Sequence, residues 1–374
     1  MFRFELIHQS RRSRARVGRI HTPHGVIETP NFVPVGTNAC VKSLTGPIVD
    51  ELDVQLLFAN TYHLMVQPGE DTVAKMGGIH SFMKRDKPII TDSGGFQVFS
   101  LAYGGVAQEI KSKGTKSGAS SIIRIREEGV WFRSYRDGRE IVLTPEISIQ
   151  AQKKIGADII VSFDELPPYH TTPRRLRSSL DRTHRWELRS LTEHKKNVQQ
   201  QALYAVIHGG VDPQLRSESV QLLRSHDFDG YAIGGSVGKN QTEMIDMLQL
   251  LMPQMPEHAP NHLLGIGDIP SIHACIPLGI DTFDSSHPTK CARHGLLFTN
   301  TEMVRIKKSA YAQDMLPIDP TCDCSTCTTY SRAYIHHLFK AHELTAYSLA
   351  SIHNVAYMVR LMKRYREMIL EGDI

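Results

Sequence analysis

Short apolar runs recur along the chain at intervals that suit parallel strands. Eight such runs occupy residues 31–35, 54–59, 88–91, 158–163, 203–207, 231–233, 263–266 and 280–283. Most of them are separated by stretches with helical periodicity, which predict helices over residues 147–155, 174–191, 217–223 and 241–252. Eight strands that alternate with helices specify an α/β protein of the (β/α)8 class, the TIM barrel, whose site is built at the carboxyl ends of the strands.

Two further patterns lie outside this repeat. Alternating runs at residues 16–20 and 26–29 flank a turn signal at 22–25, which predicts an N-terminal β-hairpin. The interval between the third and fourth predicted strands is too long for one helix. We expect a flexible loop over residues 111–121 and a second hairpin over 129–142, which together form an insertion at about 101–143 on the active face.

Polar and glycine residues follow most of the predicted strands. They include Asn60, Asp92, Asp164, Glu165, His208, Gly234, Gly235, Gly267, Asp268 and Asp284. A single residue of this kind is explained by an ordinary turn or helix cap. So many at the carboxyl ends of strands predict a functional site at the mouth of the barrel. Two carboxylates, such as Asp92 and Asp284, are the minimum set of side chains needed to break and re-form a glycosidic bond.

Composition limits the possible classes of protein. The chain of 374 residues is long enough for one barrel with additions, and its 22% charged and 41% hydrophobic residues are ordinary for a globular protein. A formal charge of +4 permits an anionic partner such as nucleic acid without requiring one. No apolar run approaches the length of a membrane span, and the first residues lack the order of a signal peptide. We therefore expect a cytoplasmic protein without membrane contact.

Basic residues gather in two places. The predicted helix at 174–191 carries several arginines, among them Arg182, Arg185 and Arg189 on one side, which fits an exposed outer helix at least as well as a phosphate contact. Lys290 and Arg293 follow closely after Asp284. Basic side chains beside a bond-breaking carboxylate suit a polyanionic substrate.

Three of the six cysteines form a run that indicates a metal site. Cys322, Cys324 and Cys327 have the spacing of thiolates around one tetrahedral ion, and His336, His337, His342 or His353 could supply the fourth ligand. A closed site of this kind is structural rather than catalytic. We therefore expect a catalytic barrel over residues 1–304, followed over 305–374 by a zinc-binding subdomain and C-terminal helices packed on the barrel.

Several motifs together carry a family resemblance. They are N-T-Y-H-L at residues 60–64, T-D-S-G-G-F-Q at 91–97, F-D-E at 163–165, G-Y-A-I-G-G at 230–235, G-I-D-T-F-D at 279–284 and the cysteine run with a later histidine. Jointly they resemble the tRNA-guanine transglycosylases of the bacterial type, also called queuine tRNA-ribosyltransferases. The resemblance covers nearly the whole chain. It implies a homodimer that exchanges the wobble guanine of tRNAs with a GUN anticodon for a 7-deazaguanine base, either queuine or preQ1.

The resemblance also implies a role for individual residues. Asp284 matches the nucleophile that attacks the ribose and holds the tRNA as a covalent ester, and Asp92 matches the acid/base that acts as proton acceptor. The residues implied to bind the base or its ribose are Asn60, Ser93, Gly94, Gly95, Phe96, Asp164, His208, Gly234, Gly235 and Leu264. Those implied to contact RNA are Gly265, Ile266, Gly267, Asp268, Ile269, Pro270, Ser271, Thr289, Lys290, Cys291, Ala292 and Arg293. Cys322, Cys324, Cys327 and His353 match the ligands of one structural Zn2+ ion. The target base must leave its stack to reach such a pocket.

Some positions depart from the pattern of the family. His208 stands where a glutamine is usual, Leu166 where bacterial members usually have cysteine, and Lys239 where a glutamate is common. These departures predict that queuine is accepted at least as well as preQ1. The segment at 103–121 is also unusual for the family.

Two other classes of function remain to be distinguished. A non-catalytic, zinc-stabilised tRNA-binding subunit need not retain both Asp92 and Asp284, and both are present. An ordinary glycoside hydrolase would leave the cysteine run and the basic loop after Asp284 unexplained.

Overall fold

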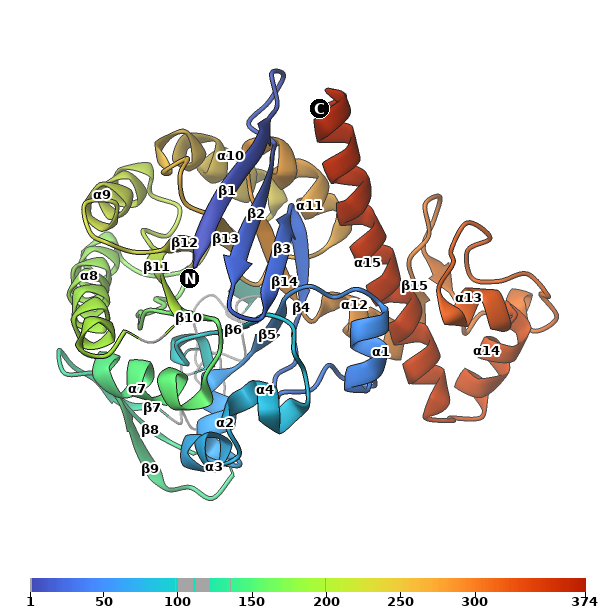
Figure 1. Ribbon diagram of the computed structural model, residues 1–374, viewed down its shortest axis with the longest axis horizontal. Helices are drawn as coiled ribbons and strands as arrows, with labels where there is room; N and C mark the ends of the chain where they lie inside the picture. The colour runs from blue at the N-terminus through green and yellow to red at the C-terminus, as the bar shows by residue number, and fades with distance from the viewer. Residues whose placement is uncertain (1, 98, 100–109, 112–121, 135, 199) are drawn as a thin grey trace.

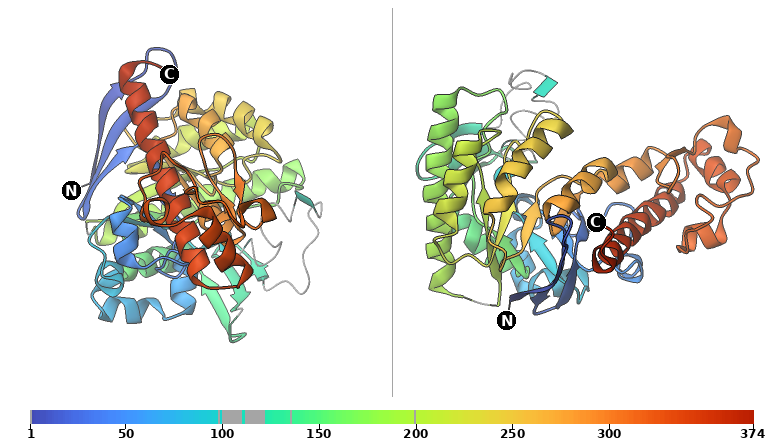
Figure 2. Two further views of the ribbon diagram at one scale, coloured as in Figure 1. Left: turned by 90° about the vertical axis from the view of Figure 1, so that its right-hand side faces the viewer. Right: turned by 90° about the horizontal axis from the view of Figure 1, so that it is seen from above.

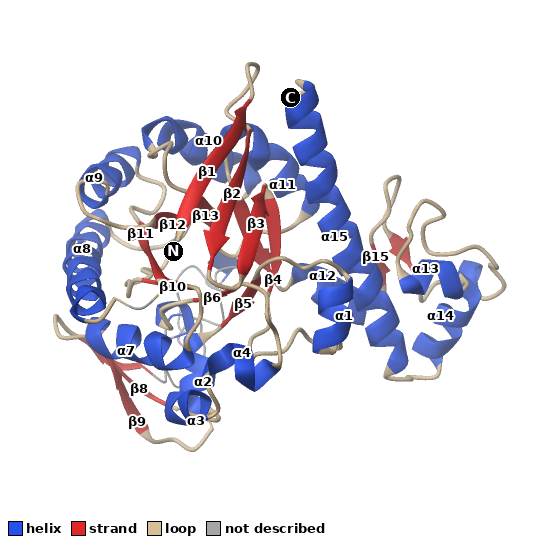
Figure 3. Ribbon diagram, in the orientation of Figure 1, coloured by secondary structure: helices blue, strands red, loops and turns tan. Residues whose placement is uncertain are grey.

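Eight parallel strands wind around a common axis at the centre of the structure, with helices outside them (Figure 1, Figure 3). The computed structural model describes residues 2–374 apart from 98, 100–109, 112–121, 135 and 199. The barrel strands are β4 (Asn31–Pro34), β5 (Leu57–Ala59), β6 (Ile89–Thr91), β10 (Ile159–Val161), β11 (Ala202–Ile207), β12 (Gly230–Ile233), β13 (Asn261–Leu263) and β14 (Thr282–Ser285). They pair in the order β4-β14-β13-β12-β11-β10-β6-β5, and a parallel bridge between Val35 and Phe58 closes the circle. The predicted (β/α)8 barrel is confirmed.

Helices connect the barrel strands. They are α1 (Gly46–Glu51), α2 (Thr61–Val66), α3 (Glu70–Lys75), α4 (Gly78–Met83), α7 (Pro145–Ile155), α8 (Pro173–Lys196), α9 (Pro213–Leu223), α10 (Gln241–Leu251), α11 (Ile269–Cys275) and α12 (His287–Arg293), with 3-10 turns η1 (Met252–Gln254) and η2 (Ile276–Leu278). Three of them begin alike, because Thr144, Thr172 and Asp212 each accept an N–H of the first helical turn and precede a proline. The helices predicted from periodicity are α7, α8, α9 and α10, with ends displaced by a few residues.

An antiparallel sheet covers the amino ends of the barrel strands. It contains β1 (Arg3–Gln9), β2 (Arg16–Thr22) and β3 (Gly25–Thr29). Arg16 donates to Asp281, just before β14, at 2.9 and 2.6 Å, and His24 bonds to Asp158, just before β10, at 2.7 Å. The predicted hairpin is β2–β3. Strand β1 was not predicted, although its first residues, R-F-E-L, alternate polar and apolar side chains as a strand does. With this end closed, the carboxyl ends of the strands form the mouth.

The insertion between β6 and β10 packs beside the mouth. Its strands β7 (Ile122–Ile125), β8 (Val130–Arg133) and β9 (Glu140–Leu143) form a separate antiparallel sheet, in which β8–β9 is the second predicted hairpin. Phe132 lies 5.3 Å from the ring of Tyr62 on α2, and Trp186 of α8 donates to the Glu127 carbonyl at 2.7 Å. Except for Lys111, the loop predicted at 111–121 lies outside the described residues.

The C-terminal part stands out from the barrel and returns to it through one long helix (Figure 2). It contains β15 (Leu296–Leu297), β16 (Val304–Arg305), η3 (Ser309–Tyr311), α13 (Ser325–Thr329), α14 (Arg332–Lys340) and α15 (Thr345–Glu371). Helix α15 packs on α12, and its Arg366 donates to the Pro30 carbonyl at 2.9 Å. Among the described residues, no helix combines the length and the apolar character that a membrane span requires.

Candidate active site

Asp92 lies directly after β6 and is buried at the mouth of the barrel. Its Oδ1 accepts the Thr61 amide at 2.8 Å, and its Oδ2 accepts the side-chain amides of Asn60 and Gln97 at 2.7 and 2.8 Å. Burial raises the pKa of Asp92 to about 6; the hydrogen bonds oppose this rise, and the charge of Asp284 adds to it. A carboxyl group with this pKa can take and return a proton close to neutral pH.

Asp284 lies at the mouth in β14 and is also buried. Its Oδ1 accepts the Gly265 amide at 2.7 Å and lies 3.1 Å from Nε2 of His262. Its Oδ2 has no hydrogen-bond partner in the part of the chain that the structure describes. One oxygen of this carboxylate is therefore held in place, and the other is left for a ligand.

Both carboxylates line one pocket of about 510 Å3. The predicted residues that line it are Asn60, Asp92, Ser93, Phe96, Asp164, Gly235, Leu264, Gly265, Ile266 and Asp284. The other lining residues are Val35, Thr37, Phe58, His63, Gln97, Val161, Leu166, Val237, Gly238, Ser285 and Ser286. A pocket of this volume, mainly apolar with a few polar groups, suits a flat heterocyclic base.

A polar network borders the side of the pocket near β10 and β11. Asp164 accepts from the Ser93 hydroxyl through Oδ1 at 2.9 Å, and its Oδ2 lies 2.8 Å from Nε2 of His208. His208 does not line the pocket itself but stands behind Asp164. Its Nδ1 would lie 2.7 Å from a Cβ at position 235, where φ is +78°, so only glycine fits there.

Arg216 holds the two loops that carry this network. It is fully buried on α9 and donates to the carbonyls of Ile207, Gly210 and Ser236 at 2.6, 2.8 and 3.3 Å. Burial lowers the pKa of Arg216 to about 9. The side chain therefore fixes the loops after β11 and β12 relative to each other, a function that no sequence pattern indicated.

The remaining predicted residues lie beside the pocket rather than in it. Gly94 and Gly234 are not lining residues. A Cβ on Gly234 would lie 2.5 Å from Val206, so this glycine is required by packing. The predicted RNA-contacting residues form the turn after β13, the start of α11 and most of α12, all on the mouth side. Asp268 caps α11 by accepting the Ser271 amide at 3.0 Å.

Three polar residues near the carboxylates were not predicted from the sequence. Gln97 bonds to Asp92, His262 to Asp284, and Arg216 to the loops. Gln97 stood inside a quoted motif and could have been found from its position five residues after Asp92. His262 precedes an apolar run and resembles a core residue, so only the fold reveals it.

The cysteine run and one histidine come together in the C-terminal part. Cys322, Cys324, Cys327 and His353 are all buried, and their ligand atoms lie within 4.8 Å of one another. Nδ1 of His353 is 3.6, 3.9 and 3.2 Å from the three sulfurs in chain order. A tetrahedral ion with Zn–S and Zn–N bonds of ordinary length would set these distances at about 3.6 Å. Nε2 of His353 donates to the Phe298 carbonyl at 2.6 Å, which leaves Nδ1 as the ligand atom.

The arginines of α8 are engaged by carboxylates. Arg182 pairs with Glu165, Arg185 binds Glu127 at 2.7 and 2.9 Å, and Arg189 binds Glu146 at 2.7 and 2.8 Å. These partners support the exposed-helix interpretation over a phosphate contact.

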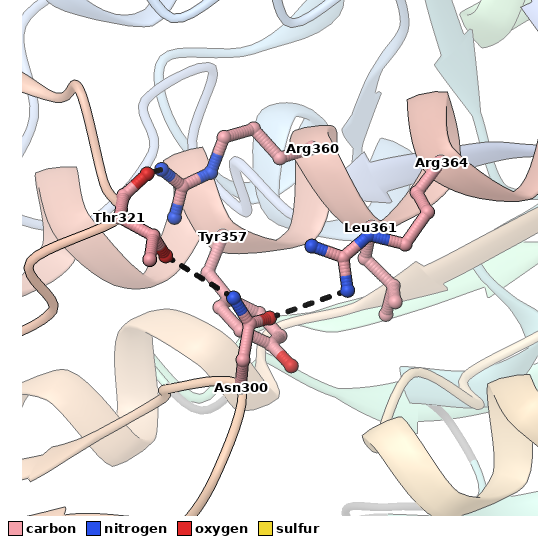
Figure 4. Close-up of a pocket in the computed structure, with 6 residues that line it drawn as sticks. All are labelled: Asn300, Thr321, Tyr357, Arg360, Leu361 and Arg364. Carbon is pink, nitrogen blue, oxygen red and sulfur yellow. Dashed lines mark hydrogen bonds between the residues drawn. The ribbon is translucent and has the colours of Figure 1, made fainter.

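A second pocket lies between α15 and the loop before α13 (Figure 4). Its lining residues are Asn300, Thr321, Tyr357, Arg360, Leu361 and Arg364. Arg364 reaches the Asn300 side chain, and Arg360 reaches the Thr321 carbonyl, both at 3.5 Å. None of the described residues that line this pocket is a carboxylate, so it lacks the pair of carboxylates found at the barrel mouth.

Comparison with known proteins agrees with this location. The model of the family described as queuine tRNA-ribosyltransferase matches residues 10–374. A queuine tRNA-ribosyltransferase from Protochlamydia amoebophila is 60% identical over 373 residues, which cover 100% of this chain and 96% of the relative. Proteins of the same name from Chlamydia caviae and from Chlamydia trachomatis serovar L2 are 54% and 51% identical, with 100% of this chain and 99% of each relative covered.

A (β/α)8 barrel with two carboxylates in one pocket at its mouth defines a class of enzymes that act on glycosidic bonds. The family model and the relatives described above match almost the whole chain. The chain belongs to the queuine tRNA-ribosyltransferase family of glycosyltransferases, the tRNA-guanine transglycosylases.

Proposed function

We propose that Asp284 is the nucleophile and Asp92 the proton-transfer group in exchanging the wobble guanine of tRNAs with a GUN anticodon. The observation that carries this proposal is the contrast between the two groups in one pocket. Asp284 has one free carboxylate oxygen, whereas Asp92 is enclosed by donors and has a pKa of about 6. The first setting suits attack on carbon, and the second suits movement of a proton.

The reaction proceeds in two displacements. Oδ2 of Asp284 forms a bond to the anomeric carbon, the bond from that carbon to guanine breaks, and the electron pair goes to guanine, which takes a proton from Asp92. In the second displacement, a 7-deazaguanine gives its proton to Asp92, and its ring nitrogen attacks the same carbon. The carboxylate of Asp284 is then released. Two displacements at one carbon retain its configuration.

The base fits between Phe96 and Leu264, with its hydrogen-bonding edge toward Asp164. Asp164 is oriented for this by Ser93, and Gly235 lines the pocket at a position where a Cβ would meet His208. Gly94 has a φ of +86°, which allows a sharp turn beside the pocket, and Gly95 packs where a Cβ would lie 2.7 Å from the Asp164 carbonyl oxygen. Asn60 uses its amide nitrogen on Asp92, so its carbonyl oxygen is available to a ribose hydroxyl.

The RNA-binding surface consists of the turn after β13 with the start of α11, and of α12. Lys290 is exposed, and neither Lys290 nor Arg293 has a carboxylate within 4.0 Å among the described residues. Unpaired cations beside the nucleophile support contact with the phosphates that flank the flipped nucleotide.

The incoming base that we propose is queuine, accepted at least as well as preQ1. His208 bonds to Asp164 and so alters the group that reads the base. Lys239 brings no carboxylate that would favour the cationic aminomethyl group of preQ1.

The ion that we propose for the Cys3His group is Zn2+. Three thiolates and one imidazole at tetrahedral spacing are typical zinc ligands, and no position is left open for a substrate. The ion supplies a rigid crosslink between the cysteine loop and α15. The zinc-binding subdomain that we propose comprises residues 305–374.

A homodimer is the proposed assembly, acting in the cytoplasm where tRNA is found. Large apolar side chains are exposed within the zinc-binding subdomain, with Met315, Leu316 and Leu344 at 79%, 56% and 76% exposure. Exposed apolar surface of this kind is available for association with a second copy of the chain. Light scattering of the wild type and of Leu344→Lys tests this proposal, with the variant expected to be monomeric.

Trapping of a covalent protein–tRNA adduct tests the proposed roles. Wild-type protein with unmodified tRNA should give a band that resists denaturation, and Asp284→Asn should give none, because an amide is a poor nucleophile. Asp246→Asn, on an exposed turn of α10, is the control for a lost carboxylate. An adduct with the folded Asp284→Asn protein would exclude Asp284 as the nucleophile. Absence of an adduct in the wild type would favour the non-catalytic subunit.

A further inference from the structure

His262 is buried inside the barrel in direct contact with Asp284. It lies on β13 with no exposed surface, and its ring stacks on Phe58 with centroids 5.9 Å apart. Nε2 faces Oδ1 of Asp284 at 3.1 Å, and Nδ1 faces the Thr282 hydroxyl at 2.8 Å. Asp284 is the only charged side chain that the described structure places within bonding distance of this imidazole.

The protons of this contact can be assigned. A carboxylate only accepts hydrogen bonds, so an ionised Asp284 at 3.1 Å requires a proton on Nε2. Nδ1 then either accepts the Thr282 proton or carries a second proton, in which case Thr282 donates to the Asn261 carbonyl at 3.1 Å. Both arrangements share the bond from Nε2–H to Oδ1. The opposite tautomer would place two lone pairs against each other in a buried site, at a cost in free energy.

We propose that His262 is a positioning residue that keeps Asp284 turned with Oδ2 toward the sugar. This inference rests on the proposed role of Asp284 as nucleophile. The imidazole and the Gly265 amide together hold Oδ1 from two directions, so the carboxylate cannot rotate without losing both bonds. The stack on Phe58 and the bond to Thr282 fix the ring itself.

The same two donors serve both displacements. While the ester exists, Oδ1 is its carbonyl oxygen and carries little charge, and Oδ2 is bonded to the anomeric carbon. When the incoming base attacks, the bond from that carbon to Oδ2 breaks and its electron pair returns to the carboxylate. Donors placed where negative charge develops lower the barrier of such a step.

Substitution of His262 tests this role. His262→Phe keeps the ring and its stack but loses the donor, whereas His262→Gln keeps an N–H in a similar place. We expect His262→Phe to lower kcat by about 100-fold with KM for tRNA unchanged, and His262→Gln to recover most of that loss. His262→Phe should also slow adduct formation in a single turnover, because Oδ1 of Asp284 has lost one of its two donors. A purely structural role would lower the melting temperature without splitting kcat from KM and without recovery in His262→Gln.

The controls separate the possible failures. His194→Phe replaces another buried histidine, on α8 and away from the mouth, and reports on the general cost of such a change. If His262→Phe melts like His194→Phe and matches the wild type in kcat and in the rate of adduct formation, the inference is overturned while the adduct assay still supports Asp284. If Asp284→Asn itself forms the adduct, the proposed nucleophile and the role of His262 fail together. Equal losses in the Phe and Gln variants would also overturn the role of the donor.

Discussion

The two carboxylates at the barrel mouth are held in opposite ways. Asp92 has both oxygens engaged, by three neutral N–H donors, and still has a pKa of about 6 because burial outweighs the donors. Asp284 has one oxygen engaged by the residues that the structure describes. Residue type alone therefore does not set a role. The oxygen atom without a donor suits Asp284 to attack on carbon, and the raised pKa suits Asp92 to transfer a proton near neutral pH.

The difference follows from the neighbours that the fold supplies. Asp92 lies beside the end of β5, whose next residues Asn60 and Thr61 point polar groups at it. Asp284 lies beside the end of β13, where the chain turns away through Gly265 and offers one amide. Parallel strands place their carboxyl ends at one edge, so each carboxylate takes donors from the strand beside it, and Asp92 takes a further one from Gln97 in its own loop.

Loss of either carboxyl group should have the largest effect on the exchange reaction. We expect Asp92→Asn to lower the exchange rate by about 10²- to 10⁴-fold while a covalent adduct still accumulates over long incubation. Asp284→Asn should give no adduct at any time. Quenched time courses with labelled tRNA measure both. A rate near that of the wild type in Asp92→Asn would show that this residue transfers no proton in the slow step.

Removal of the metal should weaken tRNA binding by α12, which follows Asp284, and should leave proton transfer by Asp92 unchanged. His353 is followed on α15 by Asn354, which donates to the carbonyls of Pro288 and Leu296 at 3.0 Å and so holds α12. Cys324→Ser should therefore lower metal content, melting temperature and affinity for tRNA together, because a closed site contributes to folding.

Cys40→Ser is the control for the metal experiment, since Cys40 is an exposed cysteine outside the Cys3His group. It should leave metal content and melting temperature unchanged. The second displacement needs ionised Asp92, so its rate should still fall as pH drops through about 6 in both variants. Full stability of metal-free Cys324→Ser protein would show that the cysteines do not support the fold.

A smaller change should shift only the pH dependence of proton transfer by Asp92. Gln97→Met removes one donor from Oδ2 of Asp92, and loss of a bond to the ionised form raises the pKa of Asp92 above about 6. The second displacement needs the ionised form, which is lost as pH falls through this pKa. Its acid limb should therefore move to higher pH in the variant, by less than about one pH unit.

Single-turnover rates from preformed adduct measure this limb between pH 5 and 8. Gln150→Met, which breaks a side-chain bond to Glu193 away from the mouth, is the matched control. An unchanged limb in Gln97→Met would assign it to a group other than Asp92.

Much of this architecture could be predicted from the sequence, for identifiable reasons. Barrel strands buried on both sides give continuous apolar runs, and Asp92, Asp164 and Asp284 stand directly after such runs or close to them. The spacing of Cys322, Cys324 and Cys327 is local and needs no fold. The fourth ligand, His353, came only from the family resemblance, because a contact between distant segments leaves no local pattern.

What could not be predicted lies in contacts across the fold. Arg216 and His262 face inward from positions that resemble ordinary helix and strand residues. Lys239 seemed to belong to the pocket, but it is not a lining residue, and its amide donates to Glu243 at 2.7 Å. The division of the chain at residue 304 stays a prediction.

The preference for one incoming base should change least on substitution. The residues that set it lie at the mouth of the barrel, away from Asp92 and Asp284. His208 engages Oδ2 of Asp164, so one oxygen of the base-reading carboxylate is already bonded before a base arrives. His208→Gln replaces the imidazole with an amide that both donates and accepts, and should shift the ratio of kcat/KM for queuine over preQ1 toward preQ1 by about 3- to 10-fold, the size of one hydrogen bond. Lys239→Glu should change the ratio in the same direction but less, because Lys239 does not line the pocket. Purified protein, unmodified tRNA and each base in turn provide the measurement. A wild-type protein that prefers preQ1 and incorporates no queuine would exclude the proposal, whatever the two variants do.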